Sequence, residues 1–140
     1  MSTRAFGARV QRNIDPQLLK GQGAFVDDIP LTGALHVAFV RSPFARARIS
    51  GIDASAARAL PGVAAVYTAD DIGALDREMP LLIPHPSMND ARTQRPLARG
   101  DVHYVGQTVA MVVAVDRYTA EDAALLVDVD YDPLQVEIDL

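Results

Sequence analysis

The stretch YVGQTVAMVVAVDRYTAEDAALLVDVDYDPL, residues 104–134, decides the fold of this 140-residue chain. From Thr108 onward its first half is a nearly continuous apolar run, which is typical of a central buried strand. The following DRYTAEDAALLV predicts a helix that Asp116 or Thr119 can cap, with alanines and Val127 on its buried side. The closing DVDYDPL alternates acidic and apolar side chains and ends at a proline, as a half-exposed strand does. A strand, a helix and a strand in this order indicate an α/β or α+β domain.

Two further strands are predicted upstream. ALHVAFVRS, residues 34–42, is apolar on both faces, so we expect both of its sides to be covered. FARARIS, residues 44–50, alternates, with Arg46 and Arg48 on the charged face. IDASAARALPG then predicts a short helix capped by Asp53, and VAAVYT predicts the next strand.

The remaining chain is less regular. Residues 1–20 have no clear apolar period and are interpreted as an N-terminal arm, extended or docked, ahead of a single domain at 21–140. A short strand is possible at Phe25-Val26, within a stretch rich in turn residues. The segment 73–96 contains several prolines and no periodic pattern, and a connection of this length is usually functional or laid on a partner.

The composition excludes several classes of function. The chain carries 13 Lys+Arg against 18 Asp+Glu, a formal charge of −5, which argues against nucleic acid as its partner. It contains no cysteine, so it supplies no disulfide, no thiolate nucleophile and no cysteine ligand for zinc or iron–sulfur clusters. No apolar run approaches the ~20 residues of a membrane span. These features predict a soluble, cytoplasmic protein with no membrane partner.

No constellation of catalytic or metal-ligating residues is apparent. The histidines at 36, 85 and 103 have no metal-site spacing, and no GxSxG elbow accompanies them. The GQG at 21–23 lacks the remainder of a nucleotide-binding fingerprint. The acidic residues at 128, 130 and 132 share one strand face and are interpreted as a solvated edge. We therefore assign no catalytic, cofactor-binding or metal-binding residue to the chain.

The candidate functional surface is a set of arginines together with one turn. Arg41, Arg46 and Arg48 lie among apolar residues in an otherwise acidic chain, without the stacking aromatics of a nucleic-acid groove. Such arginines suit pairing with carboxylates within the chain or across a subunit contact. With Gly106 and Gln107, which mark a bulge or turn before the buried strand, they form the candidate subunit interface.

Several motifs in order resemble one known family. RSPFARARI, PGVAAVYTADD and YVGQTVAMVVA, followed by AEDAALLVDVDYDPL, closely resemble the a/b-hammerhead domain of the large subunit of molybdenum hydroxylases. This is the xanthine dehydrogenase, aldehyde oxidase and carbon monoxide dehydrogenase family, and the likeness covers about residues 21–139. One departure is Phe44-Ala45-Arg46, where many members have histidines on either side of the alanine.

The resemblance implies an α+β hammerhead fold, a mixed β-sheet with flanking helices. It also implies a part in the oxidation of a small organic molecule at a molybdenum–pyranopterin centre, with water supplying the oxygen. Electrons would leave through [2Fe-2S] clusters, commonly to FAD. In the family the pterin contacts lie in domains after the hammerhead, so these cofactors are assigned to partner chains: a molybdopterin-binding chain, a [2Fe-2S] chain and an FAD chain. We therefore predict a separately encoded hammerhead subunit that is not catalytic alone. The alternatives are a stand-alone scaffold domain without redox activity and an excised fragment of a longer enzyme.

Overall fold

The computed structural model describes residues 7, 9, 12–83, 85–88 and 93–136, and the chain divides into two units, 1–33 and 34–140. In the first unit, helix α1 spans Asp15–Leu19, with a proline in its first turn, where the missing N–H costs nothing. The 3-10 helix η1 spans Val26–Asp28. The strand expected at Phe25-Val26 is wrong, because the Phe25 backbone N–H donates to Asp28 Oδ2 at 2.9 Å and turns the chain.

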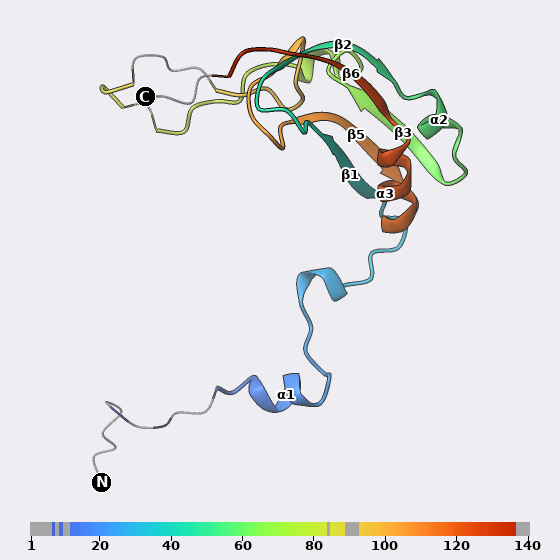
Figure 1. The fold of residues 1–140 in the computed structure, drawn as a ribbon. Coiled ribbons are helices and arrows are strands. Elements are labelled where there is room, and N and C mark those ends of the chain that lie inside the picture. The colour runs from blue at the N-terminus through green and yellow to red at the C-terminus, as the bar shows by residue number, and fades with distance from the viewer. Residues whose placement is uncertain (1–6, 8, 10–11, 84, 89–92, 137–140) are drawn as a thin grey trace. The chain divides into compact units, whose positions relative to one another are not determined.

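The second unit contains two antiparallel sheets of three strands each, in the orders β1-β5-β3 and β4-β2-β6 (Figure 1). The α+β class is confirmed, but two antiparallel sheets stand where the resemblance implied one mixed sheet. None of the described helices is long and apolar enough to cross a membrane. Along the chain the elements are β1 (His36–Arg41), β2 (Ala47–Asp53), α2 (Ser55–Ala59), β3 (Val63–Thr68), η2 (Gly73–Leu75), β4 (Asp101–Val102), β5 (Thr108–Ala114), α3 (Arg117–Leu125) and β6 (Asp128–Pro133).

One face of the sheet β1-β5-β3, here called the inner face, carries the main core. Strand β5 lies at the centre of this sheet, as its apolar run predicts. Helices α2 and α3 each contribute a fully buried alanine, Ala57 and Ala123, and side chains this small allow a helix to approach a sheet closely. The buried members of this cluster are Ala54, Ala57, Val66, Ala110, Val112, Ala123 and Val127.

A bulge in the β1–β5 pairing joins this core to a second one. Val40 pairs with Ala110 but Arg41 pairs with Thr108, so Val109 is an extra residue in β5. Val109 and Ala110 are both fully buried although they are neighbours in a strand. Val109 enters a second cluster with Ala47, Ala98 and Val102, which belongs to the sheet β4-β2-β6.

The opposite side of the sheet β1-β5-β3 is apolar and partly exposed. On this side, Val37 of β1 pairs with Val113 of β5, and Phe39 pairs with Met111. On the other edge of β5, Val113 pairs with Ala65 of β3 and Met111 pairs with Tyr67. Val37 remains 48% exposed and Phe39 43% exposed, so cover for this second side of β1 stays a prediction. We call this side the outer face and define it as Val37, Phe39, Ala65, Tyr67, Met111 and Val113.

The helix caps follow the sequence closely. Asp116 is the N-cap of α3, and its Oδ1 accepts the backbone N–H of Thr119 at 2.8 Å. Asp53 lies at the end of β2 rather than at the cap position, yet its Oδ1 accepts the backbone N–H of Ser55 at 2.8 Å. Both carboxylates therefore satisfy a free donor at a helix start.

Candidate functional site

The predicted interface residues Arg41, Gly106 and Gln107 meet where the end of β1 touches the turn that precedes β5. The Ser42 backbone N–H donates to the Gln107 carbonyl at 2.9 Å, and the Gly106 N–H donates to the Ser42 carbonyl at 2.8 Å. Gly106 has φ of +89°, a backbone conformation that favours glycine. The two segments are therefore fixed to each other by reciprocal backbone hydrogen bonds.

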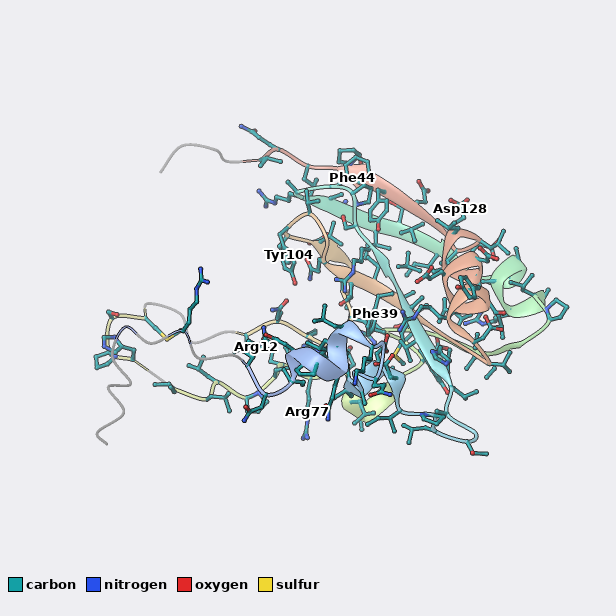
Figure 2. The ribbon with its side chains drawn as sticks, turned by 90° about the horizontal axis from the view of Figure 1, so that it is seen from below. Arg12, Phe39, Phe44, Arg77, Tyr104 and Asp128 are labelled. Carbon is teal, nitrogen blue, oxygen red and sulfur yellow. The ribbon has the colours of Figure 1, made fainter. Side chains whose placement is uncertain are left out.

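Side chains reinforce the same junction. The Gln107 side chain is buried, and its Oε1 accepts the backbone N–H of His103 at 2.7 Å. Arg41 Nη1 donates to the Gly106 carbonyl at 2.9 Å, and its guanidinium lies 5.5 Å from the centre of the Phe39 ring. Figure 2 labels Phe39 on β1 and Tyr104 in the turn. Arg41 is thus held in place at the border of the outer face, with a cation–π contact on one side.

Arg46 and Arg48 belong to a different part of the molecule: Arg48 lies in β2, a strand of the sheet β4-β2-β6, and Arg46 lies just before β2. Arg46 Nη1 donates to the Gln135 carbonyl at 3.2 Å. Arg48 lies opposite Asp101 across the β2–β4 pair, with Nε 4.0 Å from Asp101 Oδ1. All three predicted arginines are exposed, and each already has a partner within the chain. A docking role for them stays a prediction.

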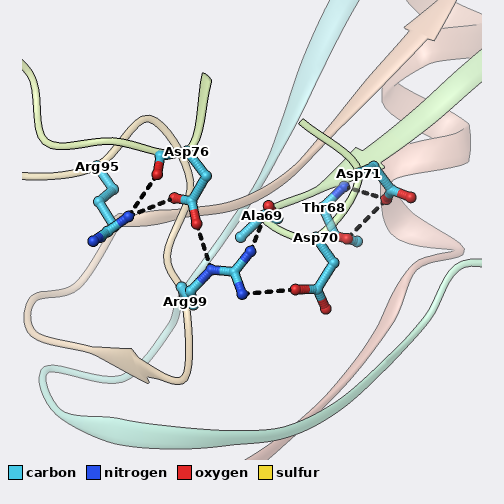
Figure 3. A network of polar contacts seen from close by, with 7 residues as sticks. All are labelled: Thr68, Ala69, Asp70, Asp71, Asp76, Arg95 and Arg99. Carbon is cyan, nitrogen blue, oxygen red and sulfur yellow. Dashed lines mark hydrogen bonds and ion pairs between the residues drawn. The ribbon is translucent and has the colours of Figure 1, made fainter. Parts of the chain in front are cut away.

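An arginine clamp that the sequence analysis missed anchors the segment 76–99. Asp76 follows η2 and has a side chain only 7% exposed. Arg99 Nε contacts Asp76 Oδ2, while the same guanidinium reaches Asp70 Oδ1 at 2.9 Å and the Ala69 carbonyl at 2.9 Å. Arg95 Nη1 donates to the Asp76 carbonyl at 2.7 Å and lies 3.2 Å from Oδ1, without the alignment of a hydrogen bond. Figure 3 shows Asp76 between these two arginines.

The clamp also sets the protonation of its carboxyl group. Burial alone would raise the pKa of Asp76, but the side chains of Arg95 and Arg99 lower it by more, so its pKa lies below the usual range. Asp76 is therefore held ionised between two cations. No local pattern signals this arrangement, because the acid and the arginines are separated by the irregular segment.

An open groove of about 840 Å³ lies beside the clamp and the Tyr104–Gln107 turn. Its polar lining includes Glu78, Arg95, Arg99, Asp101 and His103. Asp101 faces Arg48, and both arginines are engaged by Asp76. Three of the charged residues that line the groove are therefore already paired within the chain.

The three histidines lie on different segments of the chain. His85 Nδ1 contacts Ser87 Oγ at 2.7 Å, while His36 and His103 are exposed at the ends of other segments. Among the described residues, no group of three or more histidine, aspartate or glutamate side chains could hold a metal ion. Iron–sulfur clusters require cysteine thiolates, which this sequence lacks. The residues of the chain therefore do not fit the [2Fe-2S] clusters that the resemblance implies.

The family model for the a/b-hammerhead domain of aldehyde oxidase and xanthine dehydrogenase matches residues 20–135. The carbon monoxide dehydrogenase large chain of Afipia carboxidovorans is 45% identical over 137 residues, 97% of this chain and 16% of its own. The nicotine 6-hydroxylase large subunit of Paenarthrobacter nicotinovorans is 41% identical, over 99% of this chain and 17% of its own.

A solved structure agrees with these sequence matches. Reconstituted CO dehydrogenase from Oligotropha carboxidovorans superimposes with a TM-score of 0.79 and 46% identity, over 95% of this chain and 16% of that chain. The chain therefore spans about a sixth of the length of the relatives it matches.

Proposed function

Because the chain belongs to the aldehyde oxidase and xanthine dehydrogenase a/b-hammerhead family, we propose that it is one module of a molybdenum hydroxylase-type oxidoreductase. In this proposal the complete enzyme oxidises a small organic molecule with water as the oxygen source. The observation that carries it is the family match over residues 20–135 together with 45% identity to a carbon monoxide dehydrogenase large chain.

The module contributes structure rather than redox chemistry. The chain has no cysteine to ligate a [2Fe-2S] cluster, and in this proposal the molybdenum centre also lies on other polypeptide. We place them, with FAD, on partner chains of one complex. The names of relatives support an assembly of this kind, since they include a nicotine 6-hydroxylase large subunit and a subunit gamma of a 6-hydroxypseudooxynicotine dehydrogenase complex.

The arm at 1–20, the hammerhead domain at 21–140 and the segment 73–96 keep the roles predicted for them. Arg41, Arg46, Arg48, Gly106 and Gln107 form part of the contact with the partner chains in this proposal. The well-fixed junction at Ser42 and Gly106 supports such a role, because a rigid surface loses little conformational entropy on docking.

The test is purification of the native complex through a tag on this chain. We expect a molybdopterin-binding chain to co-elute, with molybdenum and iron detected by elemental analysis and oxidoreductase activity in the same fraction. A chain that elutes alone, without molybdenum or iron, would contradict the proposal and favour the scaffold alternative. An intact mass several times that of the 140 residues would place the molybdenum-binding domains on the same polypeptide.

A further inference from the structure

The outer face of the sheet β1-β5-β3 has the apolar composition of a buried surface, although several of its side chains are exposed. An antiparallel sheet with one solvated face normally alternates apolar side chains inward with polar side chains outward. The outer face instead presents valine, phenylalanine, alanine, tyrosine and methionine, and none of its six residues is charged.

The exposure of this face is uneven in a way that suits docking. Val37, Phe39 and Tyr67 on the two flanking strands are exposed, while Met111 and Val113 on the central strand are half-buried between them. The centre of a protein interface is typically enriched in aromatic residues and methionine and poor in charge, inside a polar rim. Arg41, fixed by the Gly106 carbonyl and the Phe39 ring, lies at the border in the position of such a rim residue.

The helices of the unit 34–140 pack on the inner face of the sheet and not on the outer face. Both α2 and α3 supply buried residues to the inner-face cluster on the other side of the sheet. Each of the three arginines of the candidate interface already has one partner within the chain, whereas the apolar side chains of the outer face remain partly exposed. Apolar burial, rather than arginine pairing, is then the main source of docking free energy.

We propose that the outer face is the surface on which the remaining large-chain polypeptide of the hydroxylase docks, through an uncharged apolar patch of its own. This inference rests on the proposed function. The length of the relatives supports the choice of occupant: the matching segment is 16% of the carbon monoxide dehydrogenase large chain, so in that relative most of the large chain is available to pack on this segment.

The first test is hydroxyl-radical footprinting of the native complex and of the purified 140-residue chain. Phe39, Tyr67 and Met111 report on the outer face, and Tyr118 on α3, which is 79% exposed, is the internal control. We expect labelling of the three reporters to fall about tenfold in the complex, as for side chains at a water-excluding interface centre, while Tyr118 is labelled equally in both.

The second test compares two double variants by their yield of complex. V37K/F39K places charges on the outer face, whereas Y118K/L125K makes the same kind of change at exposed positions of α3. We expect the first variant to lower the yield of complex about tenfold or more and the second to leave it unchanged, with both chains folded by circular dichroism.

The outcomes separate this inference from the function on which it rests. If molybdenum and a large chain co-purify but the three reporters stay labelled, the docking face is wrong and the proposed function stands. If no hydroxylase chain co-purifies, both fail. Protection of the reporters in a homodimer of this chain, seen by analytical ultracentrifugation, would replace the large chain with a second copy and also overturn the inference.

Discussion

The two faces of the sheet β1-β5-β3 have similar composition but opposite surroundings. The inner face packs against α2 and α3, with Val112 and Ala123 fully buried, whereas the outer face leaves Val37 and Phe39 more than 40% exposed. Apolar residues on both faces of a strand therefore show that the sequence is suited to burial on both sides. They do not show that the same chain supplies both covers.

Two neighbouring valines on β5 test the difference between the inner and outer faces most directly, because Val112 lies on the inner face and Val113 on the outer face. We expect V112D to abolish cooperative unfolding, because it buries an unpaired carboxylate, and V113D on the outer face to be milder by roughly 3 kcal/mol or more. Both changes remove the same side chain from adjacent positions of one strand, so strand propensity cancels. Chemical denaturation followed by circular dichroism measures the difference. Equal losses would mean that the outer face is as fully packed as the inner one.

The turn between α2 and β3 tests how tightly the inner face is closed. Gly62 has φ of +93°, and an added Cβ would lie 3.1 Å from Val115 and 3.2 Å from Thr119. We expect G62A to lower the free energy of unfolding by roughly 1–2 kcal/mol through its backbone conformation, and further through these contacts. G100A is the matched control, because Gly100 has φ of +77° with no atom near its Cβ position. A G100A loss equal to that of G62A would show that the contacts contribute nothing.

The clamp at Asp76 is expected to affect the local stability of the segment 77–95 more than the stability of the whole domain. D76N removes the charge that faces Arg95 and Arg99, so we expect faster proteolytic cleavage within 77–95 under native conditions, with a smaller change in Tm. D70N is the control, since Asp70 is exposed and pairs with Arg99 at the same clamp. If both variants are cleaved at the same rate, the buried carboxylate does not anchor this segment.

Much of the fold could be predicted from local patterns. The buried strand β5, the capped helix α3 and the alternating β6 each carry a complete signal within about ten residues. The exposure of the outer face could not be predicted, because the burial of a strand face depends on what packs against it, and the sequence of the strand does not specify that. The Asp76 clamp escaped because it joins residues about twenty positions apart across an irregular segment, without any period to link them.

The N-cap of α3 provides a prediction about pH. Hydrogen bonds from the Thr119 backbone and side chain hold the pKa of Asp116 below its usual range. A depressed folded-state pKa contributes stability that is fully present above the unfolded value of about 3.9 and lost as pH falls through the folded value. We therefore expect D116N, which keeps a capping oxygen, to lose less stability than the unmodified chain below about pH 4. Parallel slopes of unfolding free energy against pH would contradict this.

The smallest expected effect concerns Arg48, where the docking prediction and the internal contact can be separated. Arg48 and Asp101 are both exposed and 4.0 Å apart, so R48A should change the free energy of unfolding by less than about 0.5 kcal/mol. Any larger consequence must then arise in the complex, where charge reversal in R46E/R48E reports on docking. Unchanged assembly of that variant, beside a loss for V37K/F39K, would assign docking to the apolar outer face and leave Arg46 and Arg48 as surface residues that pair within their own chain.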